Sequence, residues 1–201
     1  VMIEVFEALL EKHKASVKTE HLAGIRHGLT ESKRELERSP EVRAGIERAI
    51  TGLDAMRGRI KAWPLRADGF AALEDGLAAS YRRGRKRLRR AEDTGDGRDF
   101  HEFRKSAKEH WYHTRLLEGL WPEPASARVG ALKDLETWLG EHHNLEVLRA
   151  RLSEEAHEGI ELLLTLAAQE QKELERNSIS LARSLFEQKP KPFVRDRSKL
   201  W

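Results

Sequence analysis

Apolar side chains recur every three or four residues along nearly the whole chain, and the alternation typical of strands is absent. The spacing is clearest in Val5, Leu9 and Leu10, and again in Ile46, Ile50, Leu53 and Ile60. Because this is the spacing of one face of a helix, and because Ala, Leu, Glu, Arg and Lys favour helices, we expect an all-α fold.

Proline and glycine turns divide this pattern. At Ser39-Pro40, for example, Ser39 is the expected N-cap and Pro40 the first helical residue. The predicted helices span residues 1–14, 18–38, 41–62, 68–93, 98–120, 125–152, 155–188 and 192–200. Several of them exceed 20 residues and their connections are short, which favours antiparallel bundles.

The composition excludes several classes of protein. The 201 residues include no cysteine, so the chain has neither a disulfide nor a thiolate metal site, which fits a reducing compartment and a cytoplasmic location. No apolar run approaches the roughly 18 residues of a membrane span, so no membrane partner is expected. The length suits a single domain, residues 1–201.

Positive charge is concentrated in one window. The net charge is only +3, but residues 81–115 hold 12 basic and 6 acidic side chains. Residues 1–80 are balanced, and residues 116–201 are net acidic. A local excess of this kind indicates an anionic partner.

The strongest pattern lies in residues 100–121. At about 100° per residue, one stripe of this predicted helix holds His101, Arg104, Lys105, Lys108, Tyr112 and Arg115. The stripe contains no acid, and so many donors on one line repel each other unless an anion lies there. A neighbouring apolar stripe, which includes Phe103 and Trp111, is expected to pack in the core.

A second basic segment, YRRGRKRLRR, occupies residues 81–90. One side of this predicted helix holds Tyr81, Arg82, Arg85, Lys86 and Arg89. A turn at residues 94–97 joins the two helices, so we expect them to lie antiparallel with their basic faces lining one groove. Arginine makes bidentate contacts to phosphate, and the predicted ligand is therefore a polyanion.

Nothing in the sequence indicates catalysis. Carboxylates are scattered at surface-like spacing, no nucleophile has a partnered base, and no glycine-rich phosphate loop is present. The histidine pairs His110/His113 and His142/His143 lack the spacing of a zinc helix. We therefore expect a binding protein without catalytic residues, metal or cofactor.

Four stretches resemble the CHAD family, the conserved histidine α-helical domain: YRRGRKRLRR, HEFRKSAKEHWYHTRLL, LKDLETWLGEHHNLEVL and LFEQKPKPF, within about residues 70–201. The resemblance implies two four-helix-type bundles related by a pseudo-two-fold, residues 1–97 and 98–201, with a basic pocket between them. It also implies binding of inorganic polyphosphate and location at polyphosphate granules. The first signature helix of the family is not found and is expected upstream of residue 1.

The resemblance also implies which residues bind the ligand: those of the cationic stripe at residues 100–121 and several others that match the family's motifs. They are His101, Arg104, Lys105, Lys108 and Tyr112, together with Tyr81, Arg82, Arg85, Lys86, Arg89, Arg115, Lys133, His142 and Lys189.

Two alternative functions stay open. The same helices could bind nucleic acid through its phosphates without sequence preference. The chain could also be the accessory domain of a polyphosphate or triphosphate hydrolase. Only Tyr81 and Tyr112 lie on the basic stripes, so stacking on bases is poorly served and polyphosphate is favoured.

Overall fold

The computed structural model describes all residues except 18–21, 65–66, 121 and 155–158, and only the backbone of residues 120 and 122–125. The described part holds eight α-helices, one 3-10 turn and no strand, so the predicted all-α fold is confirmed. The elements are α1 (Met2–Lys12), α2 (Ala23–Arg38), α3 (Pro40–Ile60), α4 (Ala71–Thr94), α5 (Gly97–Leu116), η2 (Glu118–Leu120), α6 (Pro122–Leu152), α7 (Ile160–Leu185) and α8 (Pro190–Ser198).

Local signals in the sequence explain several helix ends. The Ser39 hydroxyl accepts a hydrogen bond from the Val42 amide at 3.3 Å, with Pro40 as the first residue of α3, as predicted. Helix α4 ends at Thr94 and is followed by Gly95, whose φ of 62° is the left-handed conformation that glycine adopts without strain. The predicted break between the helices at 98–120 and 125–152 is shorter than expected: α6 already begins at Pro122, and Trp121 lies outside the described residues.

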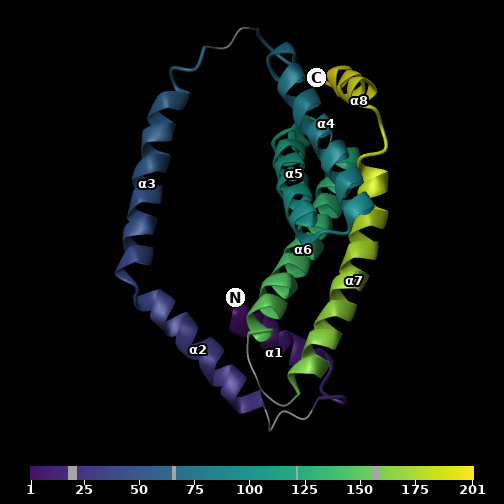
Figure 1. Cartoon of the computed structure of the whole chain (residues 1–201). Coiled ribbons are helices and arrows are strands. Elements are labelled where there is room, and N and C mark those ends of the chain that lie inside the picture. The colour runs from purple at the N-terminus through teal and green to yellow at the C-terminus, as the bar shows by residue number, and fades with distance from the viewer. Residues whose placement is uncertain (18–21, 65–66, 121, 155–158) are drawn as a thin grey trace.

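Helices α4, α5, α6 and α7 form a bundle that α8 covers at one end (Figure 1). Its core includes Tyr81, Phe103, Leu132, Leu139 and Phe193, each of which is at most 1% exposed. At Gly84 of α4 an added Cβ would lie 2.5 Å from the Phe186 ring, so the absence of a side chain at this position allows the close contact.

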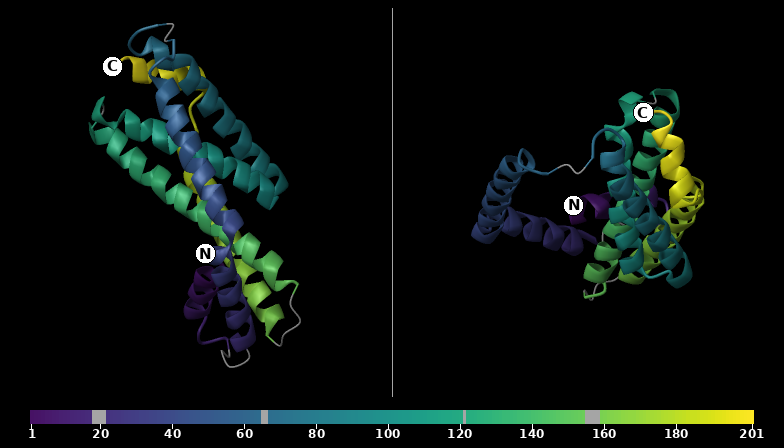
Figure 2. Two further views of the ribbon diagram at one scale, coloured as in Figure 1. Left: turned by 90° about the vertical axis from the view of Figure 1, so that its left-hand side faces the viewer. Right: turned by 90° about the horizontal axis from the view of Figure 1, so that it is seen from above.

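A second core lies at the other end of α6 and α7. Here α1 and α2 pack against the end of α6 and the start of α7 through Phe6, Leu10, Leu148 and Leu163. Helices α6 and α7 therefore run through both cores (Figures 1 and 2). The two cores do not follow the expected halves 1–97 and 98–201, because α4 packs with α5 to α8. The pseudo-two-fold stays a prediction.

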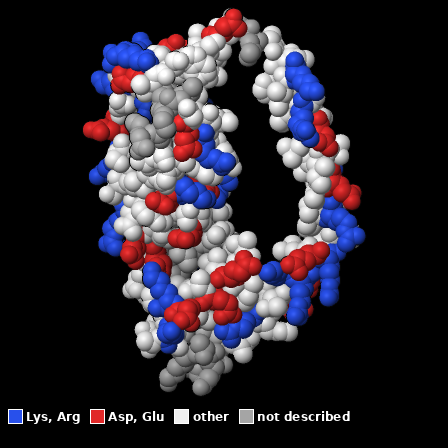
Figure 3. Space-filling view, turned by 180° about the vertical axis from the view of Figure 1, so that it is seen from behind, with Lys and Arg blue, Asp and Glu red and all other residues white. Residues whose placement is uncertain are grey.

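Helix α3 is an arm held away from the bundle, with an opening between them (Figures 1 and 3). None of its residues is buried. Six large apolar side chains along it are 40–60% exposed: Val42, Ile46, Ile50, Leu53, Met56 and Ile60.

In the described part of the chain, no helix is both long enough and apolar enough to cross a bilayer.

Candidate anion-binding face

The core positions α5 and thereby orients its cationic stripe. Phe100, Phe103, Ala107 and Thr114 are buried, which fixes the rotation of the helix. The neighbouring stripe then lies beside α6, with Arg104 and the other cations between half-buried and exposed. The predicted apolar and cationic stripes of this helix are both found.

Helices α5 and α6 lie antiparallel, as successive contacts show. The rings of His101 and His143 are 4.4 Å apart between centroids. The Arg104 guanidinium lies over Gly140, where an added Cβ would be 3.4 Å from its nitrogens. Further along, the Lys133 ammonium is 5.1 Å from the centre of the Trp111 ring.

We call this surface the α5–α6 cationic face and define it by the side chains that line it. They are His101, Arg104, Lys105, Lys108, Tyr112 and Arg115 of α5 and Lys133 and His143 of α6.

A carboxylate lies at the centre of this face. Glu136 of α6 accepts hydrogen bonds from Arg104 at 3.0 Å and from Lys133 at 2.9 Å. Lys108 lies 4.0 Å from the same carboxylate. Burial acts to raise the pKa of Glu136, but the Lys133 hydrogen bond and the charges of Lys133, Arg104 and Lys108 hold that pKa below its usual value. Glu136 is therefore an anion at neutral pH, and it neutralises part of the face.

Another acid pairs at the edge of the face. Glu102 accepts a hydrogen bond from Lys105 and forms an ion pair with Arg87 of α4 at 2.7 Å. The stripe thus has two acidic neighbours, Glu102 from the same helix and Glu136, which the fold brings from α6.

The cationic environment also affects His101. Burial lowers the pKa of its imidazole, and the charges of His143, Lys105 and Arg104 lower it further. Its Nδ1 atom is buried and has no hydrogen-bond partner. An anion bound on this face would offset the repulsion that favours the neutral ring.

The basic faces of α4 and α5 do not line one groove as expected, because the hollow between these helices is lined by Arg83, Lys86, Arg87 and Arg90 of α4 and by the acids Asp99 and Glu102 of α5. Instead, three ion pairs join the helices: Arg83–Glu109 at 2.6 Å, Arg87–Glu102 at 2.7 Å and Arg90–Asp99 at 2.7 Å. The reason is that the acids of α5 face α4, so the cationic stripe of α5 is turned toward α6. These three arginines are not among the residues that the sequence placed on the side of Tyr81.

Two residues predicted to bind on α4 have structural partners instead. Tyr81 is 1% exposed, stacks on Phe193 with ring centroids 3.8 Å apart, and donates its hydroxyl hydrogen bond to the Leu185 carbonyl at 3.3 Å. Arg85 donates to the carbonyls of Phe186 at 2.6 Å, Glu187 at 2.5 Å and Gln188, and so caps the end of α7. Tyr81 is therefore corrected to a core residue and Arg85 to a capping residue.

The other predicted residues lie apart from the cationic face or beneath it. Arg82, Lys86 and Arg89 are exposed on α4, and Lys189 is exposed at the N-cap of α8. His142 is 1% exposed, with its Nε2 atom 3.1 Å from Glu175 of α7, which corrects it from a surface donor to a buried residue.

Sequence reasoning missed Glu136 and His143 as parts of the face. His143 follows His142 directly, and a rotation of 100° separates a buried side chain from a surface one. Glu136 lies 32 positions from Arg104, and only the packing of α6 on α5 brings them together. Its spacing of three from Lys133 was the available signal.

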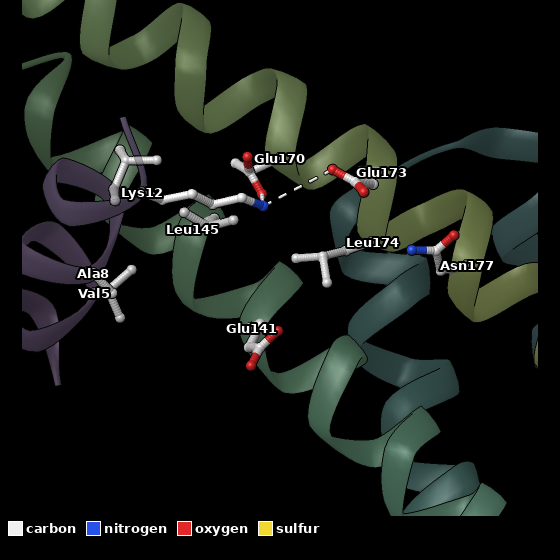
Figure 4. A pocket seen from close by; sticks show the side chains of 10 residues that line it. Val5, Ala8, Lys12, Glu141, Leu145, Glu170, Glu173, Leu174 and Asn177 are labelled. Carbon is white, nitrogen blue, oxygen red and sulfur yellow. Dashed lines mark hydrogen bonds and ion pairs between the residues drawn. The ribbon is translucent and has the colours of Figure 1, made fainter. Parts of the chain in front are cut away.

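A separate hollow of about 330 Å³ lies between α1, α6 and α7 (Figure 4). Its floor is apolar, with Val5, Leu9, Leu145 and Leu174 among the lining residues. Three carboxylates, Glu141, Glu170 and Glu173, line it beside a single cation, Lys12. This negative charge does not suit a polyanion.

On the side of the molecule in Figure 3, basic and acidic side chains are intermixed over the bundle. Within the described residues, no three His, Asp or Glu side chains converge in a way that could hold a metal ion.

One family model matches the sequence: the CHAD domain, over residues 1–153. The match includes α5 and the part of α6 that carries Lys133 to His143. It also includes residues 1–69, which the sequence resemblance had left out, and it ends before the Leu185–Phe193 stretch. No curated protein and no solved structure matches the chain.

Proposed function

The chain belongs to the CHAD domain family, and from that premise we propose that it binds inorganic polyphosphate on the α5–α6 cationic face, without chemically altering it. The observation that carries the proposal is the convergence of Arg104, Lys108 and Lys133 from two helices on a single point. In the part of the chain described, that point holds the Glu136 carboxylate, a group that presents oxygens to cations as a phosphate does.

The donors on the face suit phosphate oxygens. Arginine offers a planar fork, lysine a mobile point charge and Tyr112 an exposed hydroxyl. These groups follow the length of α5 rather than a closed cavity, so they favour a chain of phosphates over a single small anion. Binding at granules of polyphosphate follows from the same proposal.

Binding without catalysis is supported by the use of the nearby carboxylates. Glu136 is engaged by Arg104 and Lys133, and Glu102 by Lys105 and Arg87. In the described structure, both carboxylates thus act as partners of the cations on the face.

Nucleic-acid binding is the second candidate because of the aromatic pair at one end of the face. The rings of Trp111 and Tyr112 lie 4.9 Å apart, and Tyr112 is exposed. A base stacked on Tyr112 would add to contacts between the cations and the phosphates.

The test is a titration with long-chain polyphosphate at two salt concentrations, beside single-stranded DNA of matched charge. We expect polyphosphate to bind more tightly than DNA, and the double substitution Arg104→Ala and Lys108→Ala to weaken binding by at least about ten-fold, since each contact to a charged group contributes roughly 1.5–3 kcal/mol.

The matched control is Lys33→Ala with Arg34→Ala, which removes the same charge from α2, where both cations pair with acids on exposed surface. It should bind as the wild type does, and circular dichroism should show that both variants stay helical. Equal weakening in both variants would point to net charge alone and contradict a defined site. Equal affinity for DNA would favour the nucleic-acid candidate.

A further inference from the structure

Glu136 differs from the other acids near the cationic face in its position. Its side chain is 9% exposed, whereas Arg104, Lys108 and Lys133 are 27%, 42% and 52% exposed. The carboxylate thus forms the floor of the face, and the three cations extend past it toward solvent.

The contacts of Glu136 are divided among the cations. One carboxylate oxygen, Oε1, accepts from Arg104 and faces Lys108, while Oε2 accepts from Lys133. A phosphate that uses all three cations at this point must take the place of these contacts or lie against a negative charge.

Arg104 has little freedom to serve both anions. Its guanidinium rests on Gly140, and its Nε atom is buried without a hydrogen-bond partner. Because the Nε and Nη2 atoms face Gly140 and Nη2 is engaged by Glu136, a bidentate contact to phosphate that uses Nη2 competes with this ion pair.

We propose that Glu136 is an internal competitor that determines which phosphates bind, excluding single and short phosphates and admitting long chains. This inference rests on the proposed function. A single phosphate that displaces Glu136 gains only the contacts that Glu136 gives up, so the net free energy of binding is small. A long chain also contacts cations on both sides of Glu136, among them Lys105 and Arg115, and several linked contacts together exceed the cost of displacing one carboxylate.

The test compares Glu136→Gln with the wild type for tripolyphosphate and long-chain polyphosphate by calorimetry at fixed salt and pH. Glutamine keeps the shape but removes the charge. We expect tripolyphosphate affinity to rise by about ten-fold or more, since a unit charge at 4 Å acts on this scale even when partly screened. The affinity for long chains should rise less, so the preference for length decreases.

Glu109→Gln is the matched control. It makes the same charge change on α5, but its partner is Arg83 of α4, on the side away from the face. This variant should keep the wild-type preference for long chains. If it gains as much as Glu136→Gln, net charge explains the effect and the inference is wrong.

The remaining outcomes separate the two proposals. If the wild type binds long chains and Glu136→Gln leaves tripolyphosphate affinity unchanged or weaker, Glu136 only positions the cations and the competitor role is overturned. If neither protein binds any polyphosphate, the proposed function fails and this inference with it. Should Glu136→Gln not fold, Glu136→Asp decides, because shortening the side chain withdraws the carboxylate from Lys133 and should give a smaller gain in the same direction.

Discussion

At the scale of single residues, the His101 imidazole on the cationic face changes its charge in response to the groups around it, among them the His143 ring, whose centroid lies 4.4 Å from its own. Burial and the charges of His143, Lys105 and Arg104 lower its pKa in the unliganded protein. A bound anion opposes these effects, so binding should be accompanied by proton uptake. We expect the affinity for polyphosphate to rise a few-fold between pH 8 and pH 5.5, across the ordinary histidine pKa of about 6.5.

The measurement is a titration of the wild type and of His101→Gln at both pH values and fixed salt. His101→Gln should show a flatter dependence, whereas His113→Gln, whose ring contacts Ser80 on α4, should keep it. Equal wild-type affinity at the two pH values would rule out the coupling. In the absence of ligand, the stability of the fold depends on pH in the opposite direction. Because the pKa of His101 is lower in the folded than in the unfolded protein, its contribution to the free energy of unfolding is fully present above the unfolded pKa and is lost as the pH falls through the folded pKa.

The sequence predicted the cationic stripe of α5 correctly because residues on one helix keep a fixed angular relation. It did not predict the partners. Glu136 reaches the stripe from another helix, and the burial of Tyr81 and His142 depends on α7 and α8 packing over them. A tyrosine beside arginines has the same helical angle whether it faces solvent or core, so only the tertiary structure decides between binding and packing.

At the scale of helices, α1 and α3 show what periodicity can and cannot predict. Both carry apolar residues at helical spacing, and both are helices in the structure. Yet Leu9 and Leu10 of α1 are buried, while Ile50 and Leu53 of α3 are more than half exposed. An apolar stripe identifies the face that could pack, and it contains no information on whether another element covers it.

The position of α3 leads to a prediction about stability. Because Ile50 and Leu53 contact little in the described structure, replacing both by alanine should change the free energy of unfolding by no more than about 0.5–1 kcal/mol. Chemical denaturation followed by circular dichroism measures this change. Backbone amides of α3 should also exchange with solvent faster than those of α6. A loss of several kcal/mol would mean that the stripe is covered in solution.

At the scale of the whole molecule, the chain is nearly neutral, and its binding chemistry is local. Basic and acidic side chains intermix on the side seen in Figure 3, and ion pairs join α4 to α5. A net charge of +3 would attract polyanions only weakly at a distance. The proposed preference for polyphosphate therefore depends on the arrangement of a few cations on α5 and α6, which in turn depends on the bundle beneath them.

That dependence yields a final prediction, because α6 and α7 run through both cores. If the cores unfold as one unit, Leu163→Ala in the second core should lower the free energy of unfolding by about 2–5 kcal/mol and shift the transition seen at the first core equally. Fluorescence of a variant that keeps Trp111 and carries phenylalanine at the other four tryptophan positions reports on the first core, against which Trp111 packs. Circular dichroism reports on all helices.

Binding of polyphosphate tests the same coupling by stabilising α5 and α6 at the first core. A ligand at 100 times its dissociation constant should stabilise the folded protein by roughly 2.7 kcal/mol and should offset a similar part of the Leu163→Ala loss. The reason is that, if the protein unfolds as one cooperative unit, ligand bound to α5 and α6 stabilises the second core as well. Two separate unfolding transitions would instead show that the long helices do not couple the cores, if ligand raised the midpoint only of the transition that tryptophan fluorescence detects.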